Sequence, residues 1–147
     1  MPDSAREIEH LLYRYAECID GGDLDGLAAL FLHGRIAPIP DAINEGPDAV
    51  RAMYDGVKIY PDGTPKTKHV TTNVIVEVDE DAGAARARSY YTVLQATDAL
   101  PLQVVITGRY HDTFHRVGGE WWFDTRTMFV DQVGDLSHHL TFEIPRS

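Results

Sequence analysis

Residues 68–78 read Lys-His-Val-Thr-Thr-Asn-Val-Ile-Val-Glu-Val, and the hydrophobic period changes there from helical to alternating. This change separates a helical first part of the chain from a predicted sheet. One face of the extended stretch carries four valines: Val70, Val74, Val76 and Val78. The alternation predicts a strand, and three more strands are predicted downstream over residues 84–97, 102–116 and 121–130. Because turn residues separate them, their order favours an antiparallel meander.

The first helix precedes this sheet and has the helical spacing of apolar side chains. Those side chains are Ile8, Leu11, Leu12, Tyr15, Ala16 and Ile19. Ser4 and Glu7 form a capping box, which predicts Ser4 as the N-cap of this helix. Gly21-Gly22 ends it.

Two shorter helices and one short strand are predicted before the sheet. Asp23 can cap the second helix, and Gly46-Pro47 can open the third, because a helix tolerates proline in its first turn. Residues 35–39 are expected to form the strand, and residues 60–65 have the turn chemistry of a mobile flap. A chain in which helices come first and strands afterwards is typical of the α+β class. We expect about three helices on a curved, mainly antiparallel sheet, with a pocket between the layers.

The length and composition favour one globular domain over residues 1–147, with a weakly structured tail from about residue 134. No apolar run approaches the roughly 20 residues that span a bilayer. The net charge of −10 opposes binding to nucleic acid, which needs clustered Lys and Arg. Cys18 is the single cysteine, and Met1 is not followed by a secretion signal, so we expect a cytoplasmic protein without a membrane partner.

Three separated segments resemble a known family: residues 8–31, Lys68 to Asn73, and Gly119 to Phe123. Together they resemble the SnoaL-like branch of the nuclear transport factor 2-like superfamily. The resemblance covers nearly the whole chain and implies a cone-shaped α+β barrel around an internal pocket. This superfamily contains enzymes and non-enzymes, so the resemblance is more specific for the fold than for an activity.

Within the family, the chain is similar to scytalone dehydratase, bile acid 7α-dehydratase and hexachlorocyclohexane dehydrochlorinase. These enzymes share an aspartate at the end of the first helix and a histidine that opens the first long strand, which Asp20 and His69 match. Tyr15 matches a tyrosine of the bile acid enzyme, and Arg126 matches an arginine of the dehydrochlorinase. The resemblance therefore implies Asp20, His69, Tyr15 and Arg126 as catalytic residues, with no cofactor.

Two departures from those enzymes argue against the dehydration of scytalone and against haloalkane chemistry. Scytalone dehydratase has a second histidine on the next strand, where this chain offers Leu94 or Gln95. The dehydrochlorinase has a lysine at the position of Tyr15.

The residues themselves support an acid–base pair. Asp20 prolongs the apolar stripe of the first helix at its C-terminus, where a lone carboxylate is unfavourable and a donor such as imidazole would stabilise it. Neutral imidazole is suited to taking a proton at neutral pH, and a carboxylate on its second nitrogen would fix the tautomer. The alternative interpretation is that Asp20 only begins a turn and that His69 lies on a polar strand face with Thr71 and Asn73.

Tyr15 and Arg126 also have ordinary alternatives, as a core aromatic and a surface cation. Four further side chains could line an apolar pocket or simply form the core: Tyr91, Phe114, Trp122 and Met128.

Metal and nucleotide sites are not expected. His111 and His115 are roughly 13 Å apart on a strand that rises about 3.3 Å per residue, too far to share a metal. His138-His139 lies in the tail without a neighbouring carboxylate or thiol cluster. Gly118-Gly119 lies between strands instead of opening a helix, so it is not a phosphate loop.

These observations lead to two hypotheses of different classes. The first is a lyase or isomerase, of dehydratase or cyclase type, in which Asp20 and His69 abstract a proton from a small, apolar, cyclic substrate. The second is a non-catalytic ligand-binding or assembly subunit resembling the small subunit of ring-hydroxylating dioxygenases. Under either hypothesis we expect a homo-oligomer, dimer or trimer.

Overall fold

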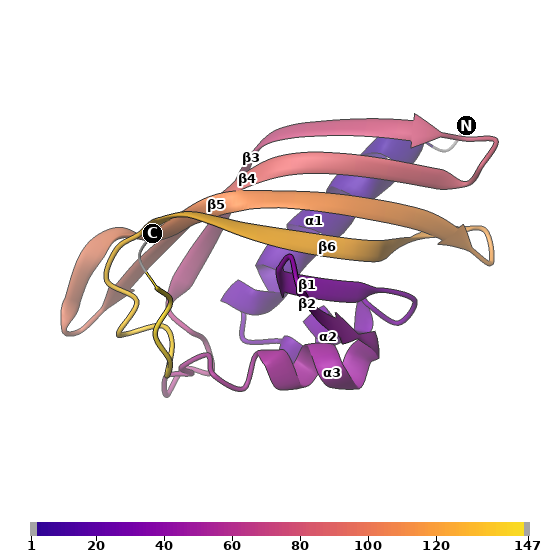
Figure 1. Cartoon of the computed structure of the whole chain (residues 1–147). Helices are drawn as coiled ribbons and strands as arrows, with labels where there is room; N and C mark the ends of the chain where they lie inside the picture. Colours follow the sequence, from indigo (N-terminus) through magenta and orange to yellow (C-terminus); the bar gives the residue numbers. More distant parts are fainter. Residues whose placement is uncertain (1–2, 146–147) are drawn as a thin grey trace.

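The computed structural model describes residues 3–145 and shows three helices packed against one face of a six-stranded sheet (Figure 1). The helices are α1 (Ser4–Asp20), α2 (Leu24–Ala29) and α3 (Gly46–Met53). The strands are β1 (Arg35–Ile39), β2 (Ala42–Glu45), β3 (Thr67–Asp79), β4 (Ala84–Thr97), β5 (Leu100–Val117) and β6 (Glu120–Val133). This arrangement confirms the predicted α+β class.

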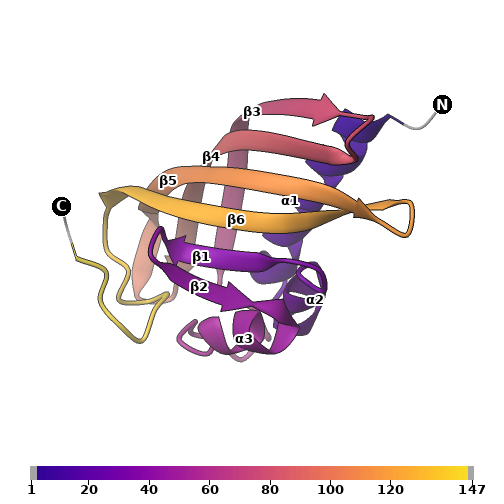
Figure 2. The same cartoon turned by 45° about the vertical axis from the view of Figure 1, so that its right-hand side comes forward.

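The sheet is strongly curved and mainly antiparallel (Figure 2). Its strand order is β2-β1-β6-β5-β4-β3, and only the pairing of β1 with β6 is parallel. The sheet does not close on itself, because β2 and β3 are its two edges. The predicted barrel is therefore an open one, and β2 is a strand that the sequence analysis missed.

The first helix buries the face predicted for it, because all six predicted apolar residues are buried. Its start was predicted one residue too late. Asp3 is the N-cap, and its side chain accepts a hydrogen bond from the backbone N–H of Arg6 at 3.2 Å, while Ser4 is already helical. An aspartate in extended conformation satisfies the same free N–H groups that a serine would.

A bulge in β3 changes which side chains face the helices. Asn73 has φ of 55°, and the pairing with β4 shifts register between Thr72 and Ile75. A single inserted residue moves side chains to the opposite face. The prediction that Val70 shares a face with the later valines was therefore wrong: Val70 is 39% exposed. His69 instead lies on the inner face with the valines that pack on the core, Val74, Val76 and Val78.

The chain after β6 folds back over one end of the space between the helices and the sheet. Residues 134–145 form turns without a helix or long strand and pair with the connection that follows α3. Val57 bridges Leu140, and the backbone N–H of Lys58 donates to the carbonyl of His139 at 2.8 Å. This segment therefore covers one end of the space between helices and sheet. None of the helices within residues 3–145 is long and apolar enough to cross a membrane.

The predicted turn at residues 60–65 packs closely against the end of α1. Gly22 has φ of 74°, and a Cβ built there would lie 1.9 Å from the carbonyl oxygen of Gly63. Only glycine fits both the backbone conformation and the contact.

We predict that Gly22→Ala lowers the free energy of unfolding by about 1–3 kcal/mol more than Gly119→Ala does, because only the first substitution also creates a clash. Gly119 is the matched control, since its φ is 84° and a Cβ there would meet no described atom within 4 Å. Denaturant unfolding measures both. Equal losses would show that the turn does not hold the end of α1.

Candidate active site

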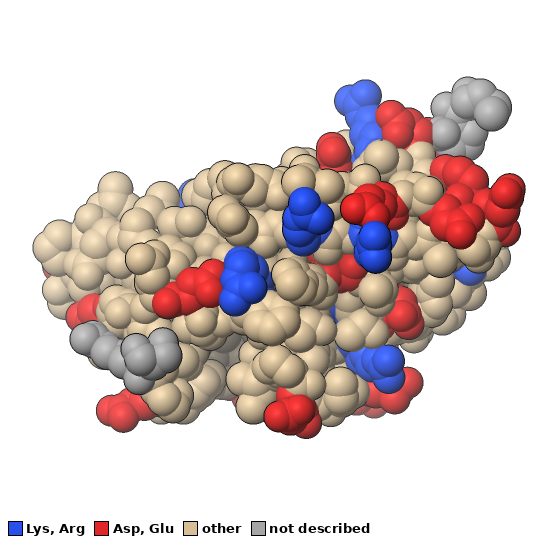
Figure 3. Space-filling model, turned by 45° about the horizontal axis from the view of Figure 1, so that its top comes forward, with Lys and Arg blue, Asp and Glu red and all other residues tan. Residues whose placement is uncertain are grey.

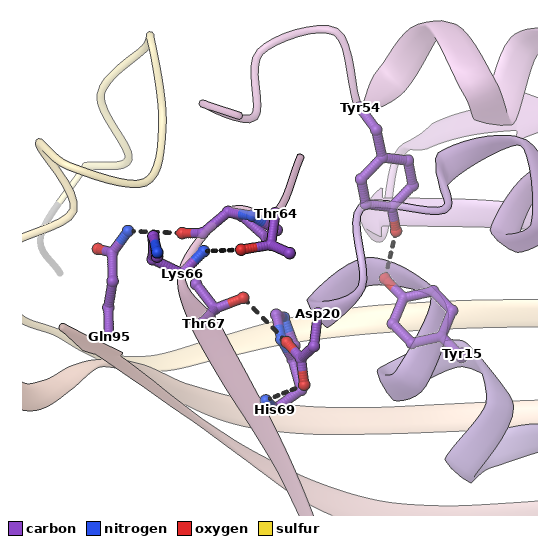
Figure 4. Close-up of polar contacts among 9 residues, drawn as sticks. Tyr15, Asp20, Tyr54, Thr64, Lys66, Thr67, His69 and Gln95 are labelled. Carbon is purple, nitrogen blue, oxygen red and sulfur yellow. Dashed lines mark hydrogen bonds and ion pairs between the residues drawn. The ribbon is translucent and has the colours of Figure 1, made fainter. Parts of the chain in front are cut away.

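Asp20 and His69 meet in a buried hydrogen-bonded pair between the end of α1 and the start of β3 (Figure 4). The distance from His69 Nδ1 to Asp20 Oδ1 is 2.6 Å. The side chains of His69 and Asp20 are only 8% and 13% exposed. The structure thus brings together the two residues on which the enzymatic hypothesis depends.

Two further donors hold the carboxylate of Asp20. The backbone N–H of His69 donates to Oδ2 at 2.7 Å, and the hydroxyl of Thr67 donates to Oδ1 at 2.9 Å. Burial raises the pKa of Asp20, but the hydrogen bonds from His69 and Thr67 outweigh burial, so the pKa lies below its ordinary value. Asp20 is therefore a carboxylate at neutral pH.

This contact determines what the imidazole of His69 can do. Because a carboxylate only accepts hydrogen bonds, the proton of the neutral ring lies on Nδ1. The lone pair then lies on Nε2, which makes no hydrogen bond to another described residue. A carboxylate behind the imidazole also stabilises the imidazolium that forms when Nε2 takes a proton. The pair has the geometry of a general base with its orienting group.

His69 lines a cavity of about 400 Å³ between the helices and the sheet. This volume is in the range of small-molecule sites. Most of the wall is apolar, with contributions from Ile19, Met53, Val93, Ile106, Met128 and Val130. Of the four side chains considered for a pocket, Tyr91 and Met128 line this cavity. Phe114 packs in the core against Phe123, and Trp122 contacts His33 instead.

Four tyrosines from α1, the end of α3, β4 and β5 form the polar part of the wall: Tyr15, Tyr54, Tyr91 and Tyr110. The hydroxyls of Tyr15 and Tyr54 are hydrogen-bonded to each other (Figure 4). Since one phenol must donate to the other, one proton of this pair is free for a ligand. Burial raises the pKa of Tyr91 to about 12 and that of Tyr15 and Tyr110 well above the ordinary value. The phenols are therefore neutral donors.

Arg126 does not lie at the cavity wall but behind it. Its side chain is fully buried and forms a bidentate ion pair with Asp112. Nε donates to Oδ1 at 2.9 Å and Nη2 donates to Oδ2 at 3.0 Å. Its Cζ lies 3.6 Å from the ring centroid of Tyr110 and 4.3 Å from that of Tyr15. Burial lowers the pKa of Arg126, but Asp112 raises it by more, so the guanidinium stays charged. Arg126 thus acts on a ligand only through the tyrosine rings.

His139, like Tyr54, is a residue of this cavity that sequence reasoning did not assign to the site. It comes from the segment after β6, is 5% exposed, and its ring centroid lies 6.3 Å from that of His69. Burial, followed by the nearby His69, lowers the pKa of His139 to about 4. The tail lacks any periodic pattern, so only its apolar residues around His139 could have indicated that it folds back onto the pocket. Within residues 3–145, no group of three or more His, Cys, Asp or Glu side chains is placed to hold a metal ion.

Comparisons with known proteins identify the family. Residues 3–127 match the model of the SnoaL-like domain, and the chain belongs to the SnoaL-like family. A protein of unknown function from Mycobacterium tuberculosis is 26% identical, with a TM-score of 0.70 over 86% of this chain and 71% of that chain. A candidate scytalone dehydratase from Novosphingobium aromaticivorans is 25% identical, with a TM-score of 0.70 over 88% of this chain and 85% of that chain.

A third solved structure has the same fold at lower identity. It is the beta subunit of a candidate aromatic-ring-hydroxylating dioxygenase from Novosphingobium aromaticivorans, 16% identical, with a TM-score of 0.70 over 88% of this chain and 90% of that chain. At this identity the likeness is one of fold alone. No curated protein matches the chain.

We predict that Asp112→Ala lowers the free energy of unfolding by about 3–5 kcal/mol, because it leaves the guanidinium of Arg126 buried without a counter-charge. The matched control is Glu77→Ala, which breaks the exposed ion pair with Arg86 and should change stability little. Denaturant unfolding measures both. Similar losses in the two variants would contradict a charged core pair.

His139 should make the protein sensitive to acid. Its pKa is about 4 in the folded chain and 6.5 when unperturbed, so the unfolded chain binds more protons between these values. Stability is then full above about pH 6.5 and falls by about 3 kcal/mol as the pH approaches about 4.

His139→Gln should remove that part of the pH dependence of the free energy of unfolding. His10→Gln replaces an exposed histidine of α1 and should leave it unchanged. Denaturant unfolding as a function of pH measures the slopes. The same slope in wild type and His139→Gln would mean that His139 is not held neutral.

Proposed function

We propose that the protein is a cofactor-free lyase or isomerase, of dehydratase or cyclase type, that abstracts a proton from carbon of a small, apolar, cyclic substrate. The observation that carries this proposal is the hydrogen bond of 2.6 Å between Asp20 and His69, buried beside an apolar cavity of about 400 Å³. A base that is oriented by a carboxylate and faces an apolar cavity is what proton abstraction from carbon requires.

Each polar group has a place in this reaction. Nε2 of His69 takes the proton, and Asp20 stabilises the imidazolium. The free phenolic proton of the Tyr15 and Tyr54 pair donates to the anion that develops on the substrate or leaving group. The positive charge of Arg126 lies behind the ring of Tyr15 and stabilises that anion without contacting the substrate. No step needs a cofactor.

The alternative, a non-catalytic ligand-binding or assembly subunit, is supported by likeness of fold alone. A subunit that only assembles does not need a buried carboxylate on an imidazole that faces a cavity. We propose self-association in addition. Figure 3 shows Lys and Arg interspersed with Asp and Glu, with areas without charge between them, and the strands of the sheet expose five large apolar side chains: Val70, Ile75, Tyr90, Leu102 and Val104. Such a face suits a second copy of the chain.

The enzyme proposal is tested by following exchange of α-protons of cyclic ketones, including cyclohexanones and tetralones, in deuterium oxide by NMR. Wild type should accelerate exchange for at least one ketone, and His69→Ala should reduce that acceleration by about 10²- to 10⁴-fold. His10→Ala is the control and should keep full activity. No exchange with any ketone, or a loss below about tenfold in His69→Ala, would overturn the proposal.

A further inference from the structure

A groove of about 460 Å³ lies on the outer face of the sheet and crosses β3, β4, β5 and β6. Arg88 and His111 line it. Along their strands these exposed residues alternate with the buried Ala87 and Tyr110, so their side chains point away from the helices. The groove is therefore separate from the cavity that His69 lines.

Three hydrogen-bond donors of the groove share one row across neighbouring strands. Arg88 of β4 pairs with His111 of β5, and His111 pairs with Thr127 of β6. Directly paired residues on one face have Cβ atoms about 4.5–5.5 Å apart. A guanidinium, an imidazole and a hydroxyl therefore lie within reach of one small group in the groove.

The polar groups of this row are not used by the fold. Within residues 3–145, Arg88 is the one arginine of the sheet whose guanidinium has neither a hydrogen bond nor an ion pair. The ring of His111 packs on Phe129, and neither this ring nor the hydroxyl of Thr127 bonds to another described residue. The other arginines of the sheet are paired: Arg35 with Thr125, Arg86 with Glu77, Arg109 with Asp131, Arg116 with Glu80, and Arg126 with Asp112.

The acids that border the groove do not neutralise Arg88. Glu77 accepts two hydrogen bonds from Arg86, at 2.6 Å and 2.9 Å. The carboxylate of Asp112 is fully buried and is bound to Arg126. The groove therefore has an unbalanced positive charge, although the whole chain has a net charge of −10. An anion that binds here is attracted by this local charge and not by the net charge.

We infer that the groove binds the phosphate group of a small molecule, either free phosphate or a phosphate monoester. A carboxylate has two oxygens, which the fork of one guanidinium satisfies. A phosphate group offers three terminal oxygens and a charge close to −2, so it can use Arg88, His111 and Thr127 together. The volume of the groove is in the range of small-molecule sites, which leaves room for an organic part beside Ile75.

The inference goes beyond the proposed function, because the groove and the cavity lie on opposite faces of the sheet. It is also compatible with self-association. Of the five apolar side chains assigned to that contact, only Ile75 lines the groove.

The test follows the imidazole resonances of His111 by NMR during titration with inorganic phosphate or acetate, at constant pH and ionic strength. Wild type should show a saturable shift and bind phosphate at least about tenfold tighter than acetate. Arg88→Gln should weaken phosphate binding by about ten- to hundredfold, and Thr127→Val by about two- to tenfold. Arg14→Gln is the matched control, since it removes the same charge from an exposed position of α1 and should leave the affinity unchanged.

Titration with phenyl phosphate distinguishes the two sources of the phosphate group. Tighter binding than that of inorganic phosphate would assign the groove to a monoester, and equal or weaker binding would assign it to free phosphate. The inference would be overturned by an unmoved His111, by equal affinities for phosphate and acetate, or by equal affinities of Arg88→Gln and Arg14→Gln. None of these results depends on whether the protein exchanges the protons of ketones.

Discussion

The carboxylate of Asp20 is the point on which the other features of the structure depend. It accepts hydrogen bonds from the imidazole and backbone of His69 and from Thr67, and so ties the end of α1 to the start of β3. A buried charge at a helix C-terminus would be unfavourable without these donors. With them, one contact fixes the helix on the sheet, orients the imidazole and defines one side of the cavity.

The other buried charges of the core are also paired. The guanidinium of Arg126 is balanced by Asp112 and covered by tyrosine rings, and neither charged group lines the cavity. The cavity wall itself consists mainly of apolar side chains, with four tyrosines, two histidines and Glu143 as its polar members. A low-polarity site strengthens each hydrogen bond to a developing anion. The burial of this ion pair behind a mostly apolar wall would suit the cavity to the proposed proton transfer at carbon.

Much of this could be predicted from the sequence where local periodicity determines the structure. The apolar stripe of α1, the change of period at β3 and the α+β class were predicted correctly. The stripe together with the family resemblance selected Asp20 and His69. Alternation alone misplaced Val70, because the bulge at Asn73 reverses the faces of β3. His139 was missed because its position depends on the long-range pairing of the tail, which leaves no local pattern.

Whether Asp20 prepares His69 to take a proton is read most directly from ¹⁵N–¹H correlations of the imidazole, recorded at a pH at which the ring is neutral. We expect a proton on Nδ1 and a lone pair on Nε2, and we expect Asp20→Asn to weaken this preference. A proton on Nε2 in the wild-type protein, or a tautomer that does not respond to Asp20→Asn, would contradict the claim that Asp20 prepares His69 to take a proton.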